Sequence, residues 1–208
     1  MPADAAFRPT SAQQAERAVR YGISMADIPQ TTGQPDRGAG AYQFTGHTLY
    51  DPLVAWEMDV ADRPGKLVPG LATSWEADPA DRRRWTFKLR EGLRFHDNEP
   101  VLAKDVVASV ARWSVRDPMG QMLRAVQNEL AAVDDRTFRW SLKRPFPKMR
   151  WALGKTNTPI CFIMPERIAS TDAGTPIRDV VGSGPFRWVA NERVPGSRIV
   201  YARNADYA

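Results

Sequence analysis

Residue types that commonly act in catalysis are sparse in this sequence, and the best candidate for a nucleophile is a serine between two glycines. Ser183 lies in the stretch Gly182-Ser-Gly-Pro185. The nucleophile elbow of serine hydrolases has the pattern Gly-x-Ser-x-Gly, in which each glycine is two positions from the serine. The glycines beside Ser183 are its direct neighbours. The spacing therefore predicts a rigid turn rather than a hydrolase site.

Metal and thiol chemistry is also poorly supported by residue spacing. The two histidines, His47 and His96, do not form the His-Glu-x-x-His pattern of a zinc enzyme, and Cys161 is the only cysteine. His96 adjoins Asp97 in a predicted turn, which suits local hydrogen bonding better than proton transfer. Cys161 lies in an apolar run over 159–164, which predicts a small buried thiol. We expect no enzymatic activity, no metal and no cofactor.

The charge balance is basic but dispersed. The 208 residues carry a formal net charge of +5, with 29 basic residues scattered among 24 acidic ones. Arg82-Arg83-Arg84 is the only basic run, and the nearby Asp78 and Asp81 predict a solvated turn. No basic stripe with interleaved aromatic residues is present, so we expect no nucleic-acid partner. A basic module that binds anions or nucleic acid remains an alternative.

Two β-hairpins and a helix are the clearest predicted elements. Residues 85–89 alternate apolar and polar side chains, which predicts a strand that pairs with 73–77 across a turn. The spacing of apolar residues over 103–113 predicts a helix after a turn at Asp97-Asn98. The second hairpin is expected to pair 130–133 with 137–142.

Weaker patterns complete the predicted elements. The expected strands cover 18–24, 186–189 and 198–203, and the expected helices cover 42–56, interrupted or begun near Pro52, 122–126 and 145–153, begun near Pro147.

Several segments resemble the dipeptide, oligopeptide and nickel class of solute-binding proteins, family 5, which serve bacterial ABC importers. They occur in the family's order over roughly 19–207 and comprise Leu67–Glu76, Trp85–Pro100, Asp105–Trp113, Val181–Phe186 and Arg203–Tyr207. Asn98 stands where the family has glycine, and asparagine is the side chain that best tolerates a positive φ. Leu102 stands where the family often has a threonine N-cap, at an expected cost of about 1 kcal/mol.

The resemblance implies a mixed α/β fold of the type II (cluster C) periplasmic-binding-protein architecture, as its N-terminal part only. The expected domains are a flexible tail at 1–18, a discontinuous domain I at 19–45 and 178–208, and an inserted domain II at 46–177. Members of the family have a third domain, which we expect to be absent from this chain. The chain is therefore expected to be an N-terminal fragment.

The same resemblance implies capture of a peptide or other small polar solute for the membrane permease subunits of an ABC importer. Domain closure around the ligand would accompany binding, and no bond would be broken. The matching loop of peptide-binding relatives lies along the ligand as an extra strand, so the expected ligand-binding residues are Ile28, Gln30, Thr31, Thr32 and Gly33. The intact protein is expected to be periplasmic or extracytoplasmic, with an export signal that this chain does not contain. A non-functional or partner-dependent remnant is the alternative.

Overall fold

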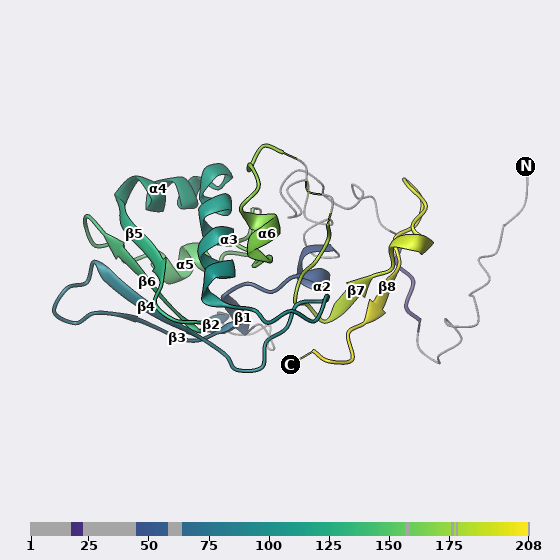
Figure 1. The fold of residues 1–208 in the computed structure, drawn as a ribbon, viewed down its shortest axis with the longest axis horizontal. Helices are drawn as coiled ribbons and strands as arrows, with labels where there is room; N and C mark the ends of the chain where they lie inside the picture. Colours follow the sequence, from purple (N-terminus) through teal and green to yellow (C-terminus); the bar gives the residue numbers. More distant parts are fainter. Residues whose placement is uncertain are drawn as a thin grey trace, which may run out of the picture.

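A four-stranded antiparallel sheet organises the larger part of the molecule (Figure 1). The computed structural model describes residues 18–22, 45–57, 64–156, 159–175, 177 and 179–207. The strand order is β3 (Ala72–Ala77), β4 (Arg84–Leu89), β6 (Thr137–Leu142) and β5 (Gln127–Ala132). Both predicted hairpins are confirmed, because β3 pairs with β4 and β5 pairs with β6.

One face of this sheet forms the main core. The apolar residues of β4 and β6 meet across the strands, with Trp85 opposite Trp140 and Phe87 opposite Phe138. The rings of the second pair stack with centroids 4.6 Å apart. Helix α3 (Ala103–Arg116) covers this face and buries Trp113. The alternation of apolar residues thus becomes one buried face and one polar face of the sheet.

Short helices surround this core. Helix α4 (Pro118–Val126) follows α3 directly, and α5 (Met149–Leu153) and α6 (Glu166–Ala169) come later in the chain. In Figure 1, α3, α4 and α6 lie on the same side of the sheet. The predicted helix over 145–153 begins only at Met149, since two prolines keep the preceding residues out of the helical conformation.

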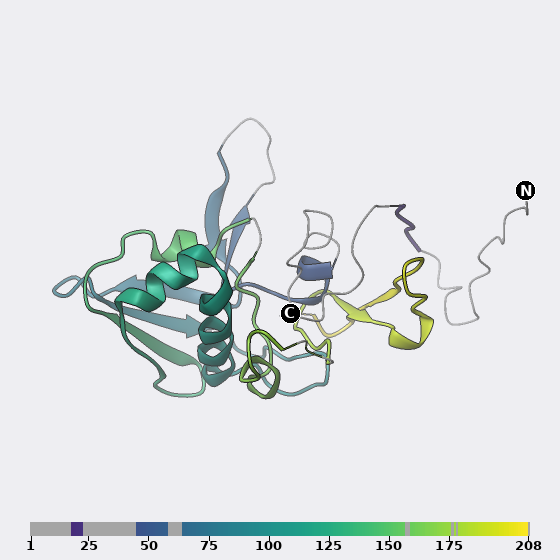
Figure 2. The same cartoon turned by 90° about the horizontal axis from the view of Figure 1, so that it is seen from above.

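The helix predicted over 42–56 is mostly wrong within the described residues. Only α2 (His47–Leu49) is α-helical, and the chain is then extended from Tyr50. Pro52 lies at an isolated β-bridge to Phe162, and β1 (Val54–Glu57) follows. β1 pairs with β2 (Lys66–Pro69) in a hairpin that stands away from the main sheet in Figure 2. Burial of Leu53 and Val54 against the core outweighs the local helical spacing.

The C-terminal segment, residues 182–207, forms a smaller sheet. β7 (Phe186–Trp188) and β8 (Tyr201–Arg203) pair as two antiparallel strands, joined through the 3-10 helix η3 (Ala190–Glu192). Both predicted strands are confirmed over shorter ranges. The predicted strand over 18–24 is not formed at residues 18–22, and its remainder lies outside the described residues. The division into domains at 1–18, 19–45, 46–177 and 178–208 stays a prediction.

The turn before β7 packs backbone against backbone. A Cβ atom at Gly182 would lie 1.9 Å from the carbonyl oxygen of Leu49, and one at Gly184 would lie 2.6 Å from the carbonyl carbon of the same residue. The amide of Gly184 donates to the Leu49 carbonyl at 2.9 Å. The absent side chains therefore permit the contact between the C-terminal segment and the end of α2.

Candidate functional site

The ligand-binding residues expected from the sequence, Ile28, Gln30, Thr31, Thr32 and Gly33, lie outside the described residues. Their role stays a prediction.

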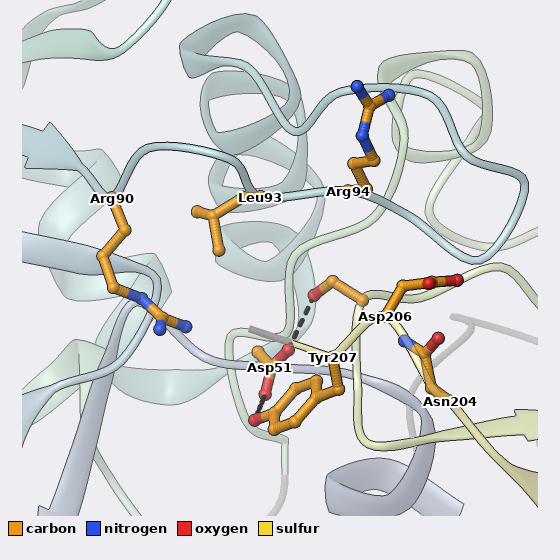
Figure 3. Close-up of a pocket in the computed structure, with 8 residues that line it drawn as sticks. Asp51, Arg90, Leu93, Arg94, Asn204, Asp206 and Tyr207 are labelled. Atoms are coloured by element: carbon orange, nitrogen blue, oxygen red, sulfur yellow. Dashed lines mark hydrogen bonds between the residues drawn. The ribbon is translucent and has the colours of Figure 1, made fainter.

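Within the described part of the chain, a shallow polar depression lies where the C-terminal segment meets the residues after α2 (Figure 3). Its cavity volume is only about 10 Å³. Small-molecule sites occupy roughly 300–1,000 Å³, so this depression is too small to enclose a peptide. It is lined by Asp51, Arg90, Leu93, Arg94, Ser183, Asn204, Asp206 and Tyr207.

Asp51 is the centre of this depression. The hydroxyl of Ser183 donates to its Oδ2 at 2.9 Å, and the hydroxyl of Tyr207 donates to its Oδ1 at 3.0 Å. Burial, together with the Asp51 carboxylate, raises the pKa of Tyr207 to about 12. One carboxylate thus joins the residues after α2 to both ends of the C-terminal segment. We call this set of hydrogen bonds the Asp51 joint. It has a structural role, since it connects distant segments, and its surface is polar.

Arg187 on β7 extends the joint. Its Nε and Nη2 both donate to Oδ1 of the buried Asn204, at 3.0 and 2.8 Å, and Nη2 also donates to Asp206 at 3.0 Å. Its Nη1 donates to the backbone carbonyl of His96 at 3.1 Å. The guanidinium therefore connects β7, the residues after β8 and the turn before α3.

His96 binds the backbone of the glycine-rich turn with both ring nitrogens. Nε2 donates to the carbonyl of Gly184 at 3.0 Å, and Nδ1 accepts from the amide of Gly182 at 3.4 Å. Burial lowers the pKa of His96 below its ordinary value of 6.5, although the bond to Gly184 opposes this effect. Turn hydrogen bonding, as expected from the sequence, is thus the geometry of this histidine.

The arrangement around Ser183 differs from a hydrolytic triad. Its hydroxyl donates to Asp51, whereas a triad requires the serine to donate to a histidine that the carboxylate orients. Both ring nitrogens of His96 are engaged by backbone groups instead.

The asparagine at the turn, Asn98, has a φ of 72°, which confirms the conformation expected from its place in the sequence.

The surroundings of Cys161 and of the metal-ligating residue types do not suit a reactive site. Cys161 is fully buried, as expected, and burial raises the pKa of its thiol. Among the described residues, no group of three or more histidine, cysteine or acidic side chains is arranged to hold a metal ion. The described helices are all too short or too polar to cross a lipid bilayer.

Sequence reasoning gave no role to Asp51, Arg187, Asn204 or Tyr207. Three of them lie in or beside segments that resemble the solute-binding family, but the sequence separation of 156 between Asp51 and Tyr207 hides their contact. The only sequence signal was the family-like end, Arg203–Tyr207, which brings the tyrosine into the joint.

Comparison with known proteins supports the resemblance. A sequence profile of the bacterial extracellular solute-binding proteins, family 5 Middle, matches residues 66–208. The probable peptide ABC transporter periplasmic-binding protein y4tO of Sinorhizobium fredii is 33% identical over 208 residues, which cover 97% of this chain and 36% of that protein. The probable D,D-dipeptide-binding periplasmic protein DdpA of Escherichia coli is 30% identical over 76% of this chain and 30% of its own length.

Solved structures share the fold. AgaA of A. tumefaciens R10, solved with agropinic acid, has a TM-score of 0.69 and 26% identity over 88% of this chain and 35% of its own. DppA of Helicobacter pylori, solved with the peptide STSA, has a TM-score of 0.66 and 25% identity over 88% of this chain and 38% of its own. The mixed α/β fold is thus part of a type II periplasmic-binding-protein architecture, as expected.

The chain spans about a third of the length of the relatives it matches. The profile nevertheless covers well over half of this chain, and the ordered segments, the Asn98 turn and the fold agree with it. The chain belongs to the bacterial extracellular solute-binding proteins of family 5.

Proposed function

We propose that this protein captures a peptide or similar small polar solute outside the cytoplasm and delivers it to the permease of an ABC importer, without breaking a bond. The observation that carries the proposal is the family match over 66–208, joined to 33% identity with y4tO across nearly the whole chain. The name of y4tO favours a peptide as the solute. AgaA was solved with agropinic acid, so an opine is the first alternative class of solute.

The proposed contact surface is the loop that contains Gln30, Thr31 and Thr32. Its backbone would pair with an extended peptide, a mode in which main-chain groups supply affinity with little dependence on side chains. The proposed capture includes closure of domains around the bound solute. A higher affinity for the closed state would then drive closure.

Calorimetric titration of the purified 208-residue chain tests the proposal directly. The ligands are pools of di- to pentapeptides, agropinic acid and Ni²⁺, each in a separate titration. We expect saturable heat with peptides and none with Ni²⁺. Binding of the opine alone would replace the peptide by another solute class, and no binding to any ligand would contradict solute capture by this chain.

The substitution Thr31→Pro distinguishes backbone pairing from side-chain recognition. Proline removes the amide N–H, and a lost hydrogen bond in the complex corresponds to a loss of about tenfold in affinity. The matched control, Thr31→Ala, keeps the amide and is expected to leave peptide affinity nearly unchanged. Equal losses in the two variants would contradict pairing at this position.

A partner-dependent remnant is the second candidate, and the small β7–β8 sheet favours it. A sheet of two strands depends on packing against other elements for its stability, and this pair exposes 40% of Phe186. Self-association and a broad thermal transition are expected for a remnant. Light scattering that shows a monomer, with one sharp calorimetric transition, would exclude this candidate.

A further inference from the structure

One end of the main sheet gathers basic side chains from three separate parts of the sequence. We call it the basic end. Its seven members are all exposed and comprise Arg82, Arg83, Arg84, Arg124, Lys143, Arg144 and Lys148. They come from the β3–β4 turn, the last turn of α4 and the connection from β6 to α5. Figure 1 shows these connections at the end of the sheet farthest from β7 and β8.

Backbone contacts hold the three parts side by side. The amide of Leu142 donates to the carbonyl of Arg83 at 2.9 Å, which joins the β3–β4 turn to the end of β6. The amide of Lys143 donates to the carbonyl of Val126 at 2.7 Å, which joins the end of β6 to the end of α4. The basic run at 82–84 is therefore one portion of a larger surface, which the sequence alone did not indicate.

Acidic residues near the basic end do not neutralise it. Asp81 is shared by two guanidiniums, with Arg83 at 2.7 Å and Arg84 at 3.3 Å. Asp78 accepts backbone amides within its own turn. Glu129 lies opposite Ser141, and Ser141 also lies opposite Arg84 on its other side. The seven basic residues outnumber these three carboxylates.

The surface between these charges has the character of a lipid contact more than that of a nucleic-acid site. Met122, on the same helix as Arg124, is 57% exposed. Single-stranded nucleic acids bind to exposed aromatic rings, on which bases stack. Here the rings of Trp85 and Phe146 pack against the core, and Trp151, which is 44% exposed, packs against Trp56.

We propose that the basic end binds the anionic headgroups of a phospholipid surface. Clustered Lys and Arg side chains are attracted to such surfaces, and apolar side chains among them can enter the headgroup region. The choice of a lipid partner rests on the proposed function, because the permease of an importer lies in a membrane. The attraction itself needs no solute, so it can be measured independently of solute capture.

Co-sedimentation of the 208-residue chain with vesicles tests the proposal. One set contains phosphatidylcholine alone, and the other contains about 30 mol% phosphatidylglycerol. The test variant is Arg82→Gln/Lys143→Gln/Arg144→Gln. The matched control is Lys66→Gln/Lys104→Gln/Arg203→Gln, which removes the same charge elsewhere. The conservative variant Arg82→Lys/Lys143→Arg/Arg144→Lys keeps the charge, and circular dichroism checks the fold of each protein.

Binding is expected only to the anionic vesicles, and it should fall steeply as salt is raised. Each basic residue near such a surface contributes about fivefold, so the test variant should lose about a hundredfold and the control far less. The conservative variant should bind like the original chain, because it keeps the charge. The comparison of the two vesicle types uses the original chain alone, so it decides the test even if the test variant misfolds. Equal binding to both vesicle types, equal loss in variant and control, or binding to single-stranded DNA without vesicle binding would overturn the proposal. Each of these outcomes leaves the calorimetric test of solute capture unaffected.

Discussion

The side chain of Asp51 connects parts of the chain that are far apart in sequence. Its carboxylate accepts hydrogen bonds from Ser183 and Tyr207, and Arg187 extends the same joint to the turn at His96. Hydrogen bonds to charged acceptors contribute more to stability than neutral ones. Tyr207 is 44% exposed, so solvent reduces its share, whereas Ser183 is buried.

The substitution Asp51→Asn is expected to lower the free energy of unfolding by about 1–3 kcal/mol, because it removes the charged acceptor of two hydroxyls. Urea unfolding measures the change. The control is Asp179→Asn, whose exposed carboxylate pairs with Arg167 and should contribute less than about 1 kcal/mol. Similar losses in the two variants would show that the joint has no special role.

Acid is expected to destabilise the protein through His96. Its pKa lies below 6.5 in the folded state, so the unfolded chain binds a proton first as the pH falls. The stability is fully present above pH 6.5 and decreases progressively below it. Burial lowers the pKa of His47 in the same direction, so it adds to the effect.

Urea unfolding at neutral and mildly acidic pH tests this dependence. The variant His96→Gln should lose less stability on acidification than the original chain, with the remaining loss due to His47. An unchanged slope in His96→Gln would contradict the assignment to His96.

At the scale of the elements, the start of α3 shows how the fold compensates for a missing cap. The side chain of Leu102 has no acceptor to offer, but its own amide donates to Asp105 Oδ2 at 2.7 Å. The amide of Ala103 donates to the carbonyl of Asp135 at 2.8 Å. Two donors that a helix start leaves without intrahelical partners are therefore satisfied by other means.

The substitution Leu102→Thr is expected to raise the free energy of unfolding by about 0.5–1 kcal/mol, because threonine adds a side-chain acceptor for the first turn. Thermal and urea unfolding both measure it. Leu102→Ala, which offers no acceptor, should give no gain. A gain in both variants would assign the effect to the loss of leucine rather than to capping.

The elements that could be predicted are those whose pattern and environment agree. The hairpins β3–β4 and β5–β6 alternate apolar and polar residues because one face packs under α3, and α3 has the helical spacing of a half-buried helix. The segment around Pro52 misled the prediction, since its apolar residues are buried in an extended conformation by partners distant in sequence, such as Phe162. The Asp51 joint was not predicted either, because its partners Ser183 and Tyr207 are distant from it in the sequence.

At the scale of the whole molecule, the described residues form two parts of unequal packing. The main sheet has four strands under a helix, with a large apolar core. The β7–β8 sheet has two strands, and a smaller cluster around Leu49, Tyr50 and Phe162 packs nearby against Trp188 and Tyr201. Local opening should therefore require less free energy at β7 and β8 than in the main sheet.

Hydrogen exchange followed by mass spectrometry tests this difference. Amides of β4 and β6 are expected to exchange slowest, and amides of β7 and β8 markedly faster. Asp51→Asn should accelerate exchange in β7 and β8 while leaving β4 and β6 nearly unchanged. Uniform exchange in both sheets would show that the two parts open as one unit.

The contact of Gly182 and Gly184 with Leu49 sets a limit on how this sequence can vary. Even alanine at either position would place a carbon atom inside the space already filled by the Leu49 carbonyl group. Gly22, with no atom near its missing Cβ, has no such restriction. In a saturation library selected for folded protein, positions 182 and 184 should tolerate no replacement, while position 22 accepts many. Natural variants of this sequence should therefore differ more readily at the polar residues of the joint than at Gly182 and Gly184.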